Sequence, residues 1–206
     1  MQNNPLTALI MATMVEAKPF VSGMSLEPVS KKPFLIFKNA KMILVICGIG
    51  KANAAMATAY CCTKFKPDTV FNIGAAGALT KLKNNGEIYH INKIIEHDRL
   101  DLKSDKPFIH NPSIIKGFKY ATLSTSDIAA INIKQRKSVS TFGGELVDME
   151  GASIVQTCKK FKTPCYLFKY VSDTLEDVEG LSIIENIRAL RQKSFTFFMD
   201  QIFNRL

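Results

Sequence analysis

Short apolar runs that alternate with helical patterns are the feature that most constrains the fold of this chain. The runs are typical of buried strands, and they occupy residues 6–12, 41–47, 69–73 and 165–171. A helical pattern over residues 52–65 separates the second run from the third. Such alternation is typical of α/β proteins. We therefore predict a single domain over residues 1–206, with a central, mixed and twisted β-sheet flanked by helices.

Glycine-containing turns follow two of the predicted strands. GIGK at residues 48–51 follows one, and GAAGA at residues 74–78 follows another. Glycines at a strand-to-helix turn let backbone amides approach a ligand closely. A Walker A loop would need glycine in place of Val45, and the dinucleotide fingerprint would need it in place of Asn53. We therefore expect a small ligand against Gly50, Gly74 and Ala75, without a phosphate-binding loop.

Three carboxylates stand at predicted strand ends. Glu16 follows the first strand, Glu150 ends a short apolar run and opens a helical pattern, and Asp173 ends the strand at 165–171. In open α/β sheets, chemistry collects where strands end and helices begin. The alternative interpretation is that Glu150 and Asp173 only cap helices, since acids favour helix N-termini. The pattern alone leaves both interpretations open.

Charge and composition restrict the classes of partner. The chain has 27 basic and 18 acidic residues, a net charge of +9, which raises the question of nucleic-acid binding. The basic residues are scattered, however, without a helix-turn-helix, zinc-finger or RNA-binding signature, so we expect no nucleic-acid partner. Apolar runs fall short of the ~20 residues of a membrane span. With no signal-peptide pattern and five cysteines without zinc-ligand spacing, we expect a cytoplasmic protein without membrane partner, metal or cofactor.

Four segments, in the same order and spread over nearly the whole chain, resemble the nucleoside phosphorylase and nucleosidase family. Within it, they are most similar to the 5′-methylthioadenosine/S-adenosylhomocysteine nucleosidases. The paired Met-Glu and Ser-Asp motifs are more specific than the glycine turns. The segments are ATMVE at 12–16, GIGKANAA at 48–55, PD at 67–68 with NIGAAG at 72–77, and VDMEGA at 147–152 with VSD at 171–173.

The resemblance implies a role for each carboxylate. Asp173 would be the general acid that protonates N7 of the departing purine, and Glu150 would hold the ribose hydroxyls. Glu16 would activate the attacking water. Nearby carboxylates suit this reaction because cleavage of a glycosidic bond develops positive charge on the sugar. The base is a poor leaving group unless it is protonated. The resemblance adds further substrate contacts from Met149, Ser172, Asp127, Ile128 and Ala129.

Several departures from the family pattern bear on the substrate. Phosphorylases of the family carry a phosphate-binding arginine near the second glycine turn, where this chain reads FNI at 71–73, so water is the expected nucleophile. The nucleosidases carry a phenylalanine that stacks on adenine, where this chain reads SDIAA at 126–130. Ala75 replaces their serine. The chain is also shorter between His97 and Phe118, where relatives build part of the pocket for the 5′ substituent.

The resemblance leads us to expect hydrolysis of an adenine-bearing nucleoside with a 5′ substituent. The candidates are methylthioadenosine, S-adenosylhomocysteine and 6-amino-6-deoxyfutalosine, the last from menaquinone biosynthesis. One alternative is a futalosine hydrolase that releases hypoxanthine. The other is a nucleoside-binding protein without catalytic activity. Relatives are commonly homodimers in which the neighbouring subunit completes the 5′ pocket, so we expect a homodimer.

Overall fold

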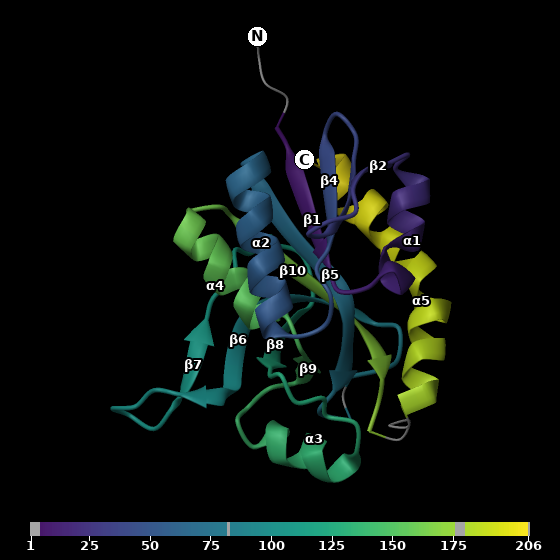
Figure 1. Cartoon of the computed structure of the whole chain (residues 1–206). Helices are drawn as coiled ribbons and strands as arrows, with labels where there is room; N and C mark the ends of the chain where they lie inside the picture. Colours follow the sequence, from purple (N-terminus) through teal and green to yellow (C-terminus); the bar gives the residue numbers. More distant parts are fainter. Residues whose placement is uncertain (1–4, 82, 176–179, 206) are drawn as a thin grey trace.

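The computed structural model describes residues 5–81, 83–175 and 180–205, and it contains one large β-sheet with helices on both faces (Figure 1). The strands are β1 (Thr7–Met11), β2 (Glu27–Ser30), β3 (Leu35–Lys38), β4 (Met42–Ile46), β5 (Thr69–Ala78), β6 (Ile88–Leu100), β7 (Pro107–His110), β8 (Tyr120–Thr125), β9 (Leu146–Asp148) and β10 (Cys165–Asp173). The helices are α1 (Met14–Gly23), α2 (Lys51–Phe65), α3 (Ile133–Ser140), α4 (Gly151–Phe161) and α5 (Gly180–Gln201), followed by a 3₁₀ turn (Phe203–Arg205).

The sheet is mixed, as the sequence predicted. Strand β1 lies between β4 and β5 and is parallel to both, and β5 is also parallel to β10. On the other side, β10 pairs with β6, β6 with β8, β8 with β9, and β9 returns to β5. These five strands therefore form a closed ring of pairings. The apolar runs at residues 33–38 and 41–47 predict a hairpin, which strands β3 and β4 form as an antiparallel pair. Strand β2 extends it at the edge.

Each face of the sheet buries its own apolar core. Helices α2 and α4 pack together over one face, above side chains such as Ile10, Val45 and Leu167. Helices α1 and α5 pack together over the other face, above Leu9, Phe71 and Phe168 (Figure 1). Consecutive residues of β1 thus point to opposite cores, as the alternation of side chains along a strand requires. The central strands are buried on both sides, which explains their continuous apolar sequence.

Three parts of the chain differ from the expectation. The polar composition of residues 101–117, with Pro107 and Pro112, predicts a loop, but β7 lies within them and pairs with β6. Pro107 starts β7 at the sheet edge, where proline is tolerated. Helix α3 and edge strand β2 were not predicted. Apolar residues near helical spacing predict a last helix over residues 181–206, but α5 ends at Gln201, and Leu206 lies outside the described residues. None of the helices in the described part of the chain is long and apolar enough to cross a membrane.

Candidate active site

The ends of three strands bring the three carboxylates of the sequence prediction to one cavity. Glu16 follows β1 and Asp173 ends β10, and both strands run parallel to β5, so their carboxyl ends meet at the same edge of the sheet. Glu150 follows β9, which runs antiparallel to β5 and pairs with its last residues. A cavity of about 210 Å³ opens there, and Glu16, Glu150 and Asp173 all line it. Each of these side chains is at least nine-tenths buried. Three residues that are far apart in the sequence therefore lie at one site in the fold.

Glu16 is fixed by the start of helix α1 and by the second glycine turn. Its Oε2 accepts hydrogen bonds from the Thr13 hydroxyl (2.8 Å) and the Thr13 N–H (3.2 Å), which completes a capping box. Its Oε1 accepts the backbone N–H of Ala75 at 2.9 Å. A Cβ atom at Gly74 would come within 3.0 Å of that oxygen. Gly74 therefore makes room for Glu16 and is not among the residues that line the cavity.

Glu150 is the N-cap residue of helix α4, but its side chain does not cap the helix. Its side chain makes no capping hydrogen bond, and Oε1 instead accepts the backbone N–H of Gly50 at 3.0 Å, across 100 residues of sequence. The N–H of Gly151 is taken by Asp148 Oδ2 at 2.9 Å. The capping interpretation is therefore wrong for Glu150. Burial raises the pKa of Glu150 to about 7, and the charge of Asp148 adds to this effect, while Lys169 and the Gly50 N–H act against it.

A buried lysine that the sequence analysis did not select lies among these acids. Lys169 of β10 is 1% exposed, and its Nζ is 2.8 Å from Asp148 Oδ2. Burial acts to lower the pKa of Lys169, but Asp148, Glu150 and Glu16 outweigh it, so the net pKa lies above the ordinary lysine value. Lys169 therefore stays charged and partly neutralises the acidic cavity. The signal in the sequence was a single basic residue inside an otherwise apolar strand.

Asp173 is held by two neighbours at the end of β10. Its Oδ1 accepts the hydroxyl hydrogen of Ser172, and its Oδ2 forms an ion pair with Nη2 of Arg136 from helix α3. The rest of the guanidinium is held by backbone carbonyls, with Nε donating to Ala130 at 2.9 Å and Nη1 to Thr174 at 3.1 Å. Arg136 is 2% exposed and lines the cavity. Nothing in the polar sequence of α3 indicated that this arginine would be buried.

The other predicted contact residues divide into two groups. Met149, Ser172, Ala75, Ile128 and Ala129 line the cavity together with the three acids. Gly50, Gly74 and Asp127 do not line it. Gly50 acts through its hydrogen bond to Glu150, and its φ of +101° is one that glycine adopts readily.

Asp127 has a half-exposed side chain that accepts the backbone N–H of Lys51 at 2.7 Å. At the described residues, no group of three His, Cys, Asp or Glu side chains is arranged to hold a metal ion.

Fold and site together define an α/β protein with an acid-lined cavity at the carboxyl ends of its strands. The model of the phosphorylase superfamily matches residues 8–122, which is more than half of the chain. This chain belongs to that superfamily. The 5′-methylthioadenosine/S-adenosylhomocysteine nucleosidases of several Staphylococcus aureus strains are similar in sequence, with 29% identity over 161 residues. The match covers 67% of this chain and 71% of each relative.

Solved structures share the whole fold. One is a 5′-methylthioadenosine/S-adenosylhomocysteine nucleosidase from Helicobacter pylori, with a TM-score of 0.86, 19% identity, and coverage of 98% of this chain and 99% of that one. Another is the native futalosine hydrolase of Helicobacter pylori strain 26695, with a TM-score of 0.85, 20% identity, and coverage of 98% of both chains. At this level of identity the likeness concerns the fold, and it confirms the mixed α/β architecture expected from the sequence.

Proposed function

We propose that the protein hydrolyses the N-glycosidic bond of purine nucleosides that carry a 5′ substituent, with adenine-bearing substrates as the leading class. The observation that carries this proposal is the convergence of Glu16, Glu150 and Asp173 on one cavity. The superfamily match and the nucleosidase relatives from Staphylococcus aureus support it. The named candidates are methylthioadenosine, S-adenosylhomocysteine and aminofutalosine.

In the proposed reaction, each acid acts on a different part of the substrate. When Arg136 leaves Oδ2, Asp173 takes up a proton from water and gives it to N7 of the purine as the bond between C1′ and N9 breaks and its electron pair passes to the base. Glu150 accepts hydrogen bonds from the ribose hydroxyls and stabilises positive charge on the sugar ring. Glu16 accepts a proton from water as the water oxygen forms a bond to C1′. The products are the free purine and a sugar with a hydroxyl at C1.

Water suits this cavity better than phosphate as the nucleophile. Glu16 lies at the second glycine turn with Oε1 on the Ala75 N–H, and a carboxylate there repels a phosphate anion. Within the described part of the chain, Arg136 is the arginine that lines the cavity, and it is engaged with Asp173 and with backbone carbonyls. Turnover should therefore be unchanged when phosphate is removed from the buffer.

Arg136 favours a second candidate substrate class, the 6-oxopurine nucleosides, of which futalosine is one. Adenine presents an acceptor at N7 and a donor at its 6-amino group, whereas hypoxanthine presents acceptors at both N7 and O6. A guanidinium can donate to O6 but not to a 6-amino group, and this contact leaves N7 free for Asp173. Arg136 also has to move from Asp173 Oδ2, or share it, when the acid faces N7. Hypoxanthine release from futalosine is therefore the alternative outcome of the same assay.

A coupled absorbance assay of base release tests the proposal. The substrates are methylthioadenosine, S-adenosylhomocysteine, aminofutalosine and futalosine, each at several concentrations and with and without phosphate. We expect release of adenine from at least one of the first three. Absence of base release from all four would refute the hydrolase. Tight nucleoside binding without product would instead support a binding protein on the same fold.

We also propose that the protein is a cytoplasmic homodimer, as the resemblance to the nucleosidases implies. The exposed side chains of Ile49, Met56 and Ile128 support this, since each is more than half exposed and Ile49 and Ile128 line the cavity. Apolar side chains gathered on a surface commonly mark interaction sites. Light scattering coupled to size-exclusion chromatography would give about twice the 22.9 kDa chain mass for a dimer and the chain mass itself for a monomer.

A further inference from the structure

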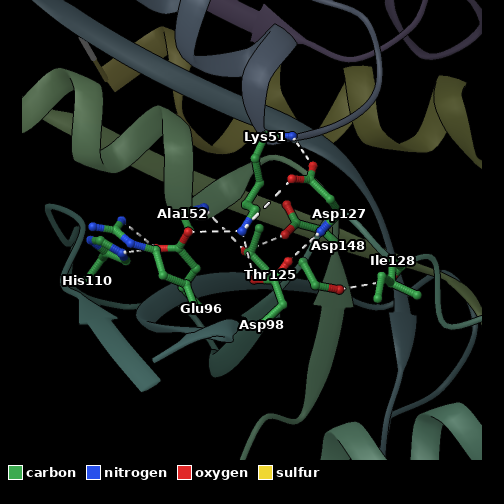
Figure 2. A network of polar contacts seen from close by, with 11 residues as sticks. Lys51, Glu96, Asp98, His110, Thr125, Asp127, Ile128, Asp148 and Ala152 are labelled. Atoms are coloured by element: carbon green, nitrogen blue, oxygen red, sulfur yellow. Dashed lines mark hydrogen bonds and ion pairs between the residues drawn. The ribbon is translucent and has the colours of Figure 1, made fainter. Parts of the chain in front are cut away.

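Lys51, the first residue of helix α2, is surrounded by acids from two other parts of the sheet (Figure 2). Its Nζ lies 3.0 Å from Glu96 Oε1 and 2.7 Å from Asp98 Oδ1, both at the end of β6. The lysine side chain is 14% exposed. The function proposed above uses none of these groups. Burying these charged side chains costs desolvation energy. Stability alone therefore does not explain why the protein places them here.

Asp127 contacts Lys51 mainly through the backbone N–H of the lysine and less through its side-chain amine. Its Oδ1 accepts the backbone N–H of Lys51 at 2.7 Å, whereas its Oδ2 is 4.0 Å from Lys51 Nζ. Its own N–H donates to Asp98 Oδ2 at 2.9 Å. Lys51, Asp98 and Asp127 therefore form a closed ring of hydrogen bonds that joins α2, β6 and the loop after β8. We call these three residues the Lys51 ring (Figure 2).

The Lys51 ring lies between two walls of the cavity. On one side, Gly50 precedes Lys51 and donates its N–H to Glu150 at 3.0 Å. On the other side, Ile128 follows Asp127 and lines the cavity with a side chain that is 67% exposed. The Ser126 hydroxyl donates to the Ile128 carbonyl at 2.8 Å, and Arg136 Nε donates to the Ala130 carbonyl at 2.9 Å, so these bonds also hold the loop. The hydrogen bonds of Asp127 add the link between this wall and the backbone of Lys51, next to the residue that binds Glu150.

We propose that Lys51 and Asp127 are positioning residues, which set the distance between Glu150 and the wall formed by Ile128 and Ala129 and thereby the affinity for the nucleoside. This inference rests on the proposed function for the identity of the ligand. It assigns neither residue to the chemical step. Opening the Lys51 ring should therefore weaken binding while the reaction of bound substrate continues at nearly the same rate.

Asp127→Ala is the main test because it removes the acceptor for the Lys51 N–H and leaves Lys51 with Glu96 and Asp98. We expect KM to rise roughly tenfold, as for one lost hydrogen bond to a charged group, and the Kd of methylthioadenosine, measured by calorimetry in the Asp173→Asn background so that the nucleoside is not cleaved, to rise equally. We expect kcat to stay within about threefold. Asp127→Asn keeps an acceptor oxygen and should restore most of the affinity. Lys119→Met, which removes an exposed ion pair with Glu87 at 3.1 Å, is the matched control and should change nothing.

Three results would overturn the inference. They are an unchanged Kd in Asp127→Ala, an equal fall of kcat and kcat/KM, and an asparagine variant as weak as the alanine variant. Lys51→Met leaves two buried acids without their cation and can fail to fold, so the inference does not depend on it. If the unmodified protein binds one of the four nucleosides of the base-release assay but cleaves none of them, the proposed hydrolase fails, and the Kd values for that nucleoside still decide on the Lys51 ring. If it binds none of the four, both proposals fall.

Discussion

Glu150→Gln tests whether the cavity is built for function at the expense of stability. Glu150 is 7% exposed, and burial, followed by the charge of Asp148, raises its pKa from the ordinary 4.5 to about 7. Glutamine removes the charge and keeps an acceptor oxygen for the N–H of Gly50. The substitution should therefore leave the local hydrogen bond intact and remove the cost of ionising a buried carboxylate.

The sign and size of the effect follow from the raised pKa. Below pH 4.5 the carboxyl is protonated in both the folded and the unfolded chain, so it adds no pH dependence. Between pH 4.5 and about 7 the unfolded chain loses this proton while the folded protein keeps it, so the free energy of unfolding falls as pH rises. At about 1.36 kcal/mol for each pH unit, the loss is about 3 kcal/mol above pH 7. The Glu150→Gln variant has no group at this position that ionises, so its free energy of unfolding does not fall in this way.

Thermal and urea denaturation at pH 5 and pH 8 measure this difference. At pH 8 we expect Glu150→Gln to gain about 3 kcal/mol over the unmodified protein, or roughly 6–12 °C in Tm for a chain of this size. At pH 5 most of the gain should vanish. Glu185→Gln, an exposed glutamate on α5, is the control and should show no such pH dependence. A gain of the same size at both pH values, or a loss at pH 8, would refute the reasoning.

Three further substitutions address the other charged groups of the cavity. Glu16→Gln should lower kcat by roughly 10²-fold, because a base that accepts a proton from water contributes about that much, while nucleoside binding is retained. Steady-state kinetics measure the change in kcat, and calorimetry measures the binding. Lys169→Met leaves Asp148 buried without its cation and should cost about 3–5 kcal/mol in urea denaturation. Arg136→Gln should lower the ratio of hypoxanthine release to adenine release by at least ~10-fold in the base-release assay, since one hydrogen bond from a charged group to O6 contributes about 1.5–3 kcal/mol.

Each of these substitutions has a result that would contradict its reasoning. Near-normal kcat in Glu16→Gln would mean that water is activated elsewhere. An unchanged free energy of unfolding in Lys169→Met would mean that the ion pair with Asp148 makes no net contribution, and Lys169→Arg serves as the control that keeps the charge. An unchanged ratio of the two bases in Arg136→Gln would remove Arg136 from base selection.

The sequence was sufficient to predict the framework of the fold because the central strands are buried on both faces. Continuous apolar runs such as residues 42–47 identify such strands without an alignment. Glycines and carboxylates at their ends then indicate where the chain has a site. The edge elements were harder to predict. Strand β2 contains Pro28, and β7 begins at Pro107, so both resemble loops in their composition.

The charged groups that face the acids could not be predicted in the same way. Lys169 interrupts an apolar strand, but the sequence does not show that Asp148, at the end of β9, forms an ion pair with it. Arg136 belongs to a short polar helix, and its burial follows from the approach of that helix to the ends of β5 and β10. Long-range pairs of this kind depend on how strands are ordered in the sheet, which composition and periodicity do not specify.

The turnover of Asp173→Asn is the most direct test of the central claim, that three acids at the strand ends cleave a purine nucleoside together. Asparagine keeps the shape of the side chain but cannot supply the proton to N7. With the best substrate from the base-release assay, we expect kcat to fall at least ~10²-fold while the nucleoside still binds. Asp200→Asn, on the exposed face of α5, should retain full activity. Turnover of Asp173→Asn within a few-fold of the unmodified protein would contradict the account.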